Sequence, residues 1–167
     1  GEGSDVVRGG PGQDQIDLSE LTSKRDVLTF ETIPAGNGKD TVFSFEQGAA
    51  GDVLNLSLLV ATPLQSVVVS FFTDVANVSN TILRLVDNGL DTASELLTAL
   101  STGGIFSTLK LSINSEAFAL SANSQATGED QHLFRISSKD SGLFVDHLAS
   151  FIGNDLDIDS WHDNNFI

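Results

Sequence analysis

Three aspartates in this chain each follow a pair of glycines in the spacing Gly-x-Gly-x-Asp, and Val or Ile stands two residues further on. The pattern occupies residues 1–7, 10–16 and 36–42, and its first two copies are offset by nine residues. Glycine permits a tight loop with positive φ, so backbone carbonyls can turn toward one point, and the aspartate adds a hard oxygen ligand beside them. Such oxygen donors suit calcium, and the apolar residue that follows begins a short strand with one buried face.

This pattern resembles the nonapeptide G-G-x-G-x-D-x-U-x (U, a large apolar residue) of RTX (repeats-in-toxin) proteins, which bacteria export by type I secretion. The fullest match is residues 9–17, Gly-Gly-Pro-Gly-Gln-Asp-Gln-Ile-Asp. In that family each repeat is one turn of a parallel β-roll, and Ca²⁺ is held between turns. The resemblance implies that the side-chain ligands are Asp5, Asp14 and Asp40 and that the loops are shaped by Gly1, Gly3, Gly10, Gly12, Gly36 and Gly38.

In a β-roll, a loop completes its ion site with the loop two repeats away. Eighteen residues after the first loop stands the segment 19–23, Ser-Glu-Leu-Thr-Ser, which lacks the calcium-loop pattern. The resemblance therefore implies that the roll ends here, that its partner turns precede Gly1, and that the ion sites are partial or irregular. The alternative is that the three segments are ordinary Asp/Gly turns of an all-β protein, although the tandem nine-residue period favours calcium loops.

The balance of charge restricts the partners of the chain. Its 167 residues carry a formal net charge of −15, with only 8 Lys and Arg, which argues against nucleic acid and anionic membrane surfaces as partners. Carboxylates in such excess repel one another in a compact state, and bound divalent cations would relieve that repulsion. The alternative is that the acidity serves solubility in a saline exterior. Cysteine is absent, which excludes disulfides, thiolate metal sites and thiol nucleophiles.

The length suits one domain with a substantial core, with room for a small appendage. The chain starts within a repeat and contains no Met, as expected of a processed or excised C-terminal piece. No N-terminal signal peptide and no membrane-spanning segment is visible in the sequence, so we expect no membrane insertion.

The expected fold is mainly β. We expect the end of a parallel β-roll over residues 1–60, leading into a β-rich, sandwich-like domain over residues 61–167 with one or two short helices. Strands are predicted near 27–30, 40–45, 66–72 and 105–113, a strand or helix start over 80–87, and a hairpin over 132–145 with its turn at 139–142. A helix is predicted over 92–100, with Asp91 or Thr92 as N-cap and Glu95 completing a capping box.

Two further segments resemble parts of RTX proteins. Residues 51–57, Gly-Asp-Val-Leu-Asn-Leu-Ser, are similar to a G-D-x-L-x-L-S motif in the segment that closes an RTX roll, and Asp52 there is either a calcium ligand or a turn cap. Residues 148–161 with the final Asn-Asn-Phe-Ile look like an uncleaved type I secretion signal near 130–167. The alternative for this end is a last strand followed by an acidic tail.

Three histidines, His132, His147 and His162, are spaced by fifteen residues. Fifteen is neither a helical nor a strand repeat, so only the fold decides whether they meet to form a metal site. The sequence contains no H-E-x-x-H zinc helix, no G-x-S-x-G nucleophile elbow and no Walker loop, and we predict no catalytic activity for this chain.

Taken with the resemblance, these features predict a calcium-binding C-terminal region of a secreted or cell-surface RTX protein. Ca²⁺ is the expected cofactor, the type I secretion apparatus is the expected export partner, and folding on Ca²⁺ is expected after export. The first expected role is a structural surface-layer or adhesin module that self-associates at the cell surface. The alternatives are a secretion and folding-assisting tail of an upstream extracellular hydrolase (protease or lipase), and a sugar-binding β module, which the lack of Tyr and the single Trp disfavour.

Overall fold

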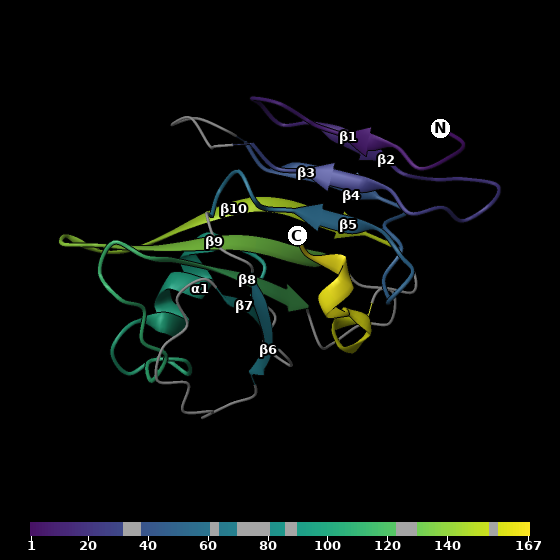
Figure 1. Cartoon of the computed structure of the whole chain (residues 1–167). Coiled ribbons are helices and arrows are strands. Elements are labelled where there is room, and N and C mark those ends of the chain that lie inside the picture. Colours follow the sequence, from purple (N-terminus) through teal and green to yellow (C-terminus); the bar gives the residue numbers. More distant parts are fainter. Residues whose placement is uncertain (32–37, 61–63, 70–80, 86–89, 123–129, 154–156) are drawn as a thin grey trace.

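Five short strands at the start of the chain alternate between two sheets. The computed structural model describes residues 1–167 apart from 32–37, 61–63, 70–80, 86–89, 123–129 and 154–156 (Figure 1). β1 (Val6–Val7), β3 (Val27–Thr29) and β5 (Val53–Asn55) form a three-stranded parallel sheet in that order. β2 (Gln15–Asp17) and β4 (Asp40–Phe43) pair in parallel within a second, seven-stranded sheet. The chain therefore crosses from one sheet to the other at each successive strand.

One local pattern marks all five of these strands. An aspartate stands before the strand or at its first position, and an aliphatic residue follows two positions later. The aspartates are Asp5, Asp14, Asp26, Asp40 and Asp52, and the aliphatic residues are Val7, Ile16, Leu28, Val42 and Leu54. The last four aliphatic side chains are buried in one cluster, and the partly buried Val7 packs against it. Because side chains alternate along a strand, this spacing directs the apolar residue of each strand into the layer between the sheets.

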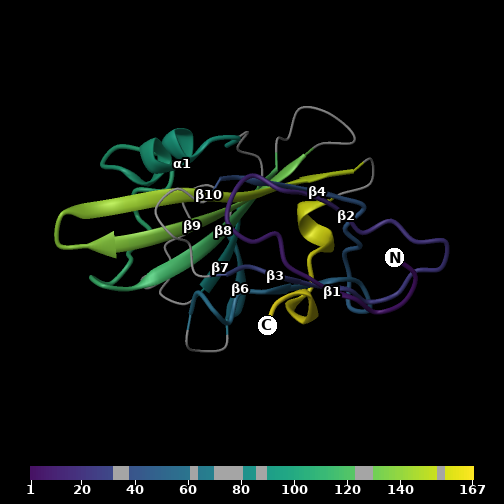
Figure 2. The same cartoon turned by 90° about the horizontal axis from the view of Figure 1, so that it is seen from above.

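The larger sheet has the order β2-β4-β10-β9-β8-β7-β6. Its remaining strands are β6 (Gln65–Val69), β7 (Thr81–Leu85), β8 (Glu116–Ala122), β9 (Gln131–Lys139) and β10 (Gly142–Ile152). β10 lies parallel to β4 and antiparallel to β9, so the predicted hairpin is confirmed. Figure 2 shows this hairpin extending away from the five N-terminal strands. The fold is mainly β, as the sequence predicts, and residues 81–85 are strand rather than helix.

Both faces of the larger sheet are buried. Two successive residues of β9 show this. Leu133 belongs to the cluster between the sheets, whereas Phe134 belongs to a second cluster on the opposite face, because side chains alternate along a strand. The helix α1 (Ala93–Leu100) contributes to the second cluster with buried Leu96 and Leu100. The predicted capping box is confirmed, since the Thr92 and Glu95 side chains each accept from the other residue's backbone N–H.

The strand predicted over 105–113 is wrong. Residues 105–108 form turns that continue from the end of α1, and no strand begins until β8. The backbone N–H of Phe106 donates to the Ala99 carbonyl at 2.8 Å, and that of Leu109 donates to the Phe106 carbonyl at 3.0 Å. These turns bury Phe106 and Leu109, which are three residues apart. The alternation of apolar residues in this segment therefore reflects the separate burial of Phe106 and Leu109 by turns, rather than one face of a strand.

The C-terminal segment closes the β5 edge of the three-stranded sheet. After the short 3₁₀ helices η1 (Ile158–Ser160) and η2 (Asp163–Asn165), Phe166 forms a parallel bridge with Leu54. The Ile167 N–H donates to the Leu54 carbonyl at 3.0 Å, and the Ile167 carbonyl accepts from the Leu56 N–H at 2.8 Å. Trp161 stacks on Phe166 with ring centroids 5.4 Å apart. The last residues thus serve as an additional strand position beside β5.

No helix in the described part of the chain has the length and apolar character needed to cross a membrane.

Candidate metal centre

A ladder of aspartates runs along one end of the three-stranded sheet. The backbone N–H of Asp5 donates to Asp26 Oδ1 at 2.9 Å, and the N–H of Asp26 donates to Asp52 Oδ1 at 2.9 Å. The carboxylates of Asp26 and Asp52 therefore each accept from the backbone N–H of the aspartate one strand earlier in the sheet. This stacking holds the three carboxyl groups at the same end of the sheet.

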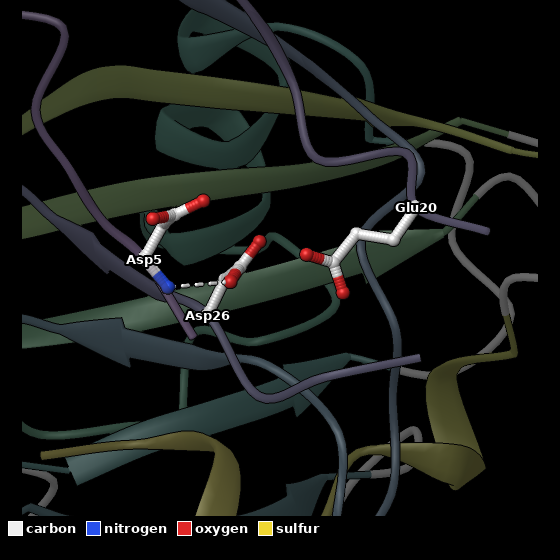
Figure 3. Close-up of side chains that lie close together, drawn as sticks. All are labelled: Asp5, Glu20 and Asp26. Atoms are coloured by element: carbon white, nitrogen blue, oxygen red, sulfur yellow. Dashed lines mark hydrogen bonds between the residues drawn. The ribbon is translucent and has the colours of Figure 1, made fainter. Parts of the chain in front are cut away.

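Glu20, in the connection between β2 and β3, joins the first two members of this ladder. Ligand oxygens of Asp5, Glu20 and Asp26 all lie within 4.8 Å of one another. Figure 3 shows the Glu20 side chain reaching toward Asp26, with Asp5 on the other side. Both carboxylate oxygens of Glu20 are buried and have no hydrogen-bond partner in the protein. Asp26 is 2% exposed, whereas Asp5 is open to solvent.

This cluster has the composition of a site for a hard cation. A carboxylate buried without a donor loses its hydration and gains nothing in return, and two neighbouring carboxylates add repulsion. The Gly1 amino group lies 3.7 Å from Asp5 Oδ2, and a divalent cation would add a positive charge shared by all three carboxylates. Calcium takes about six to eight oxygen ligands, and three carboxylates with backbone carbonyls and water can provide them. The donor set therefore fits calcium better than a metal that prefers nitrogen or sulfur.

The six-residue spacing between a glutamate and a ladder aspartate recurs at β5, the next strand of the small sheet, but the side chains there make different contacts. Glu46 precedes Asp52 by six residues, just as Glu20 precedes Asp26. The Glu46 backbone N–H donates to Asp52 Oδ2 at 2.8 Å, and the Ser23 hydroxyl donates to the Glu46 carboxylate. Burial raises the pKa of Asp52 above its ordinary value, although two backbone N–H donors counteract this. In this second copy the Ser23 hydroxyl supplies a donor of the kind that the Glu20 carboxylate lacks.

The predicted ligands Asp14 and Asp40 form a separate pair in the larger sheet. The Asp14 N–H donates to Asp40 Oδ1 at 3.1 Å, while Asp14 Oδ2 is buried with no hydrogen-bond partner. A Cβ on Gly9 would lie 3.0 Å from Asp40 Oδ2 and 3.1 Å from Asp14 Oδ2, so the loop backbone closely approaches both carboxylates. Burial raises the pKa of Asp40, and the neighbouring Asp14 carboxylate acts in the same direction.

Three glycines of the predicted loops have the positive φ that the pattern calls for. Gly3, Gly10 and Gly12 have φ values of 114°, 84° and 128°, which disfavour any residue with a Cβ. Gly38 donates its N–H to the Gly12 carbonyl at 3.0 Å, so the loops before β2 and β4 stack directly. A Cβ on Gly1 would lie 3.2 Å from Asp5 Oδ2. Gly36 lies outside the described residues.

The structure groups the predicted ligands by sheet rather than by the nine-residue repeat. Asp5 and Asp52 belong to the ladder on the small sheet, and Asp14 and Asp40 pair on the large one. The sequence prediction missed Glu20 and Asp26, because no glycine pair precedes either of them and the segment 19–23 lacks the calcium-loop pattern. A recurrence at 26 residues could have revealed them. It relates Asp14 to Asp40, Glu20 to Glu46, and residues 26–28 (Asp-Val-Leu) to residues 52–54 (Asp-Val-Leu).

Two of the three evenly spaced histidines meet. The rings of His132 and His147 have centroids 5.1 Å apart on the face of the large sheet that α1 covers. His162 instead caps η2, where its Nδ1 accepts from the Asn164 N–H at 3.2 Å. The fifteen-residue spacing therefore does not produce a three-histidine metal site.

No protein-family model, curated protein or solved structure matches this chain.

Proposed function

We propose that this chain binds Ca²⁺ through Asp5, Glu20 and Asp26 and is the C-terminal region of a secreted or cell-surface protein of the RTX type. The observation that carries the proposal is the Glu20 carboxylate, whose two oxygens are buried without a donor beside two further carboxylates. A divalent cation bound between the three side chains would balance the charge of the Glu20 carboxylate. Asp14 and Asp40 form a second candidate position, in which Asp14 Oδ2 is likewise without a donor.

The path of the chain supports the RTX assignment. Strands β1 to β5 alternate between two sheets and pair in parallel, which is the winding expected of the last turns of a parallel β-roll. An aspartate at the start of each strand agrees with ions held between turns. The larger sheet then continues into the antiparallel hairpin of β9 and β10, in keeping with a roll that leads into a β-rich domain.

In the proposed mechanism, the binding of calcium is coupled to folding. Asp5 immediately precedes β1 and Asp26 immediately precedes β3, so an ion between them joins the starts of two paired strands. Without the ion, carboxylate repulsion within a chain of net charge −15 opposes their pairing. Extracellular modules bind calcium with dissociation constants of about 10⁻⁴–10⁻³ M, so cytosolic calcium leaves the chain loose and extracellular calcium completes the fold.

The proposed biological role is structural. The loose, calcium-free chain would be a substrate of the type I secretion apparatus, and the folded chain would act at the cell surface as a surface-layer or adhesin module. Self-association there would be calcium-dependent, because the first strands carry acidic groups that repel a second copy until cations bind. No catalytic role is proposed.

The test is a calcium titration of three chains by calorimetry and far-UV circular dichroism. Glu20→Gln should weaken calcium binding about 10- to 100-fold, the range for losing one interaction with a charged group. Glu46→Gln is the matched control, because Glu46 has the same sequence spacing but accepts from Ser23. Equal affinity in the natural chain and Glu20→Gln would refute the site. Light scattering measured alongside tests the surface role, since scattering that does not grow with calcium would contradict self-association.

A further inference from the structure

The outer edge of β10 is paired along only part of its length. β9 pairs with one edge of β10 over residues 142–151, whereas β4 pairs with the other edge only over residues 149–152. Within the part of the chain that the structure describes, no strand pairs with this second edge at residues 142–148, which we call the free edge. Figure 2 shows this part of the hairpin reaching beyond the five N-terminal strands.

The backbone groups of the free edge alternate in direction. In β9, the N–H and the carbonyl of Ser138 bond to the segment just before β8. Because backbone groups alternate along a strand, the neighbouring Ser137 faces β10, where it pairs with Phe144. The N–H and carbonyl groups of Leu143 and Val145, on either side of Phe144, therefore point away from β9. Among the described residues these groups have no hydrogen-bond partner.

The free edge lacks the features that usually keep a strand edge from pairing. Natural proteins protect such edges with Lys, with Pro or with a bulge. Residues 142–147 read Gly-Leu-Phe-Val-Asp-His, with one charged residue and neither Lys nor Pro, and the bulge comes only after His147, next to β4. Phe144 is 42% exposed near the middle of this edge. An unprotected edge with unpaired donors and acceptors is a template for an added strand.

The charge of the hairpin favours a second copy of this chain as the added strand. Residues 131–152 carry two cationic residues, Arg135 and Lys139, and two anionic residues, Asp140 and Asp146, so their formal charge is zero with His neutral. The whole chain carries −15. Two copies can therefore meet at their hairpins without the local repulsion that the acidic segments would cause.

We propose that two copies of the chain pair antiparallel through their free edges, with the two Phe144 residues opposite each other. In this register Leu143 pairs with Val145 of the second copy, and both residues have outward backbone groups, so they exchange two hydrogen bonds. Phe144 then takes a non-hydrogen-bonded position, where facing side chains lie closest and aromatic pairs are favourable. A register centred on Asp146 would instead set two like charges opposite each other. The arrangement is two-fold, as in most homodimers.

The length and the charges of the free edge fit this register. The turn of the second copy ends at the level of Leu148, one residue before the position where β4 begins to pair. The exposed Lys39 immediately precedes β4, so it lies beside the place that Asp140 of the second copy reaches. Asp146 comes opposite Gly142 of the second copy, which has no charge. Opposite charges therefore meet at both ends of the pairing, and no like charges face each other across it.

This pairing assigns a surface to the self-association of the proposed function, but it uses none of the candidate calcium ligands and does not rest on calcium binding. The two proposals therefore fail separately. A chain that pairs but binds no calcium refutes only the calcium site, and a chain that binds calcium but stays monomeric refutes only the pairing. Sedimentation is measured with calcium and with chelator, in about 0.15 M salt, which screens the repulsion between two acidic chains.

The experiment combines sedimentation with disulfide trapping in a chain that has no natural cysteine. The natural chain should form a dimer in a series reaching about 1 mM, because a contact limited to one strand edge binds weakly. Phe144→Cys sets two thiols opposite each other, with Cα atoms about 4.5–5.5 Å apart, so oxidised glutathione should link them. Asp146→Cys, also exposed, is the control: its two thiols lie about 14 Å apart along the strands, so it should stay unlinked.

A charge swap tests the register without altering the core. Lys39→Asp and Asp140→Lys should each raise the dimer dissociation constant about 3- to 10-fold, because each removes two ion pairs per dimer, and the combined swap should restore it. Three results would overturn the proposal. They are a natural chain that stays monomeric at every concentration in calcium, equal linkage of the two cysteine variants, and a combined swap that does not recover.

Discussion

Asn165→Ala should destabilise the protein more than any other single amide truncation near the C-terminus. The Asn165 side chain is fully buried and joins four backbone groups. Its Nδ2 donates to the Asp52 carbonyl at 2.7 Å and to the Gly48 carbonyl at 3.0 Å. Its Oδ1 accepts from the His162 N–H at 2.8 Å and from the Gly48 N–H at 3.2 Å. Alanine would leave all four groups without this partner.

The size of the effect follows from these bonds. Each contributes about 0.5–1.5 kcal/mol net, and a buried group left without a partner costs about 1–3 kcal/mol. Gly48 is only partly buried, so water can replace some of its lost bonds, whereas the Asp52 carbonyl lies among buried residues. We expect a loss of about 3 kcal/mol, a large fraction of the 5–15 kcal/mol typical of a folded domain.

The assay is urea denaturation followed by the fluorescence of Trp161, the single tryptophan, which is 2% exposed and stacks on Phe166. Asn164→Ala is the control, because Asn164 is exposed and its side chain makes one long hydrogen bond of 3.4 Å to Ala49. That substitution should cost less than about 0.5 kcal/mol. If the two variants lose the same stability, the buried amide does not hold the C-terminal segment in place.

Two further outcomes are expected. Gly9→Ala should displace the carboxylates of Asp14 and Asp40, since the new Cβ would meet them at 3.1 and 3.0 Å, and it should lower stability in chelator by about 1–3 kcal/mol, measured by denaturation. Asp40 and Asp52 have raised folded pKa values, so the stability they contribute is fully present below their ordinary value of 3.8 and is lost as the pH rises through the raised values. Burial lowers the pKa of His132 and of His147, so their titration acts in the opposite direction, and the test therefore uses a calcium-free chain that carries His132→Asn and His147→Gln. Its stability, measured by denaturation between pH 3 and pH 6, should fall as the pH rises, and a stability that rises would contradict the prediction.

Local rules predicted the helix and most strands, because the determining residues lie close together in the sequence. The capping box of Thr92 and Glu95 spans a single turn, so it can be identified without knowledge of the fold. The strand predicted over 105–113 was wrong because turns following α1, rather than a pleated face, bury Phe106 and Leu109. Periodicity alone does not distinguish these two causes of burial.

Only part of the candidate metal centre was predicted, because some of its residues come together only in the folded sheet. Asp5 was identified because glycines precede it, whereas Asp26 follows Lys24 and Arg25, and its partnership with Asp5 arises only when the strands stack. The two aspartates are 21 residues apart, but Asp26 and Asp52 are 26 apart. The connections differ in length, so the 26-residue recurrence relates Asp26 to Asp52 but does not extend to Asp5. The shared Asp-x-aliphatic start of each strand is the more general signal.

The contact between the C-terminal segment and β5 has a kinetic consequence. Asn165 and Asp52 are separated by 113 positions in the chain, and the neighbouring bridge joins Leu54 to Phe166. Contacts between such distant residues form late, because the chain loses the entropy of closing a long loop before the contact contributes any stabilising energy. The β5 edge of the three-stranded sheet is therefore covered only after these distant residues have met. Folding should therefore be slow for a protein of this size.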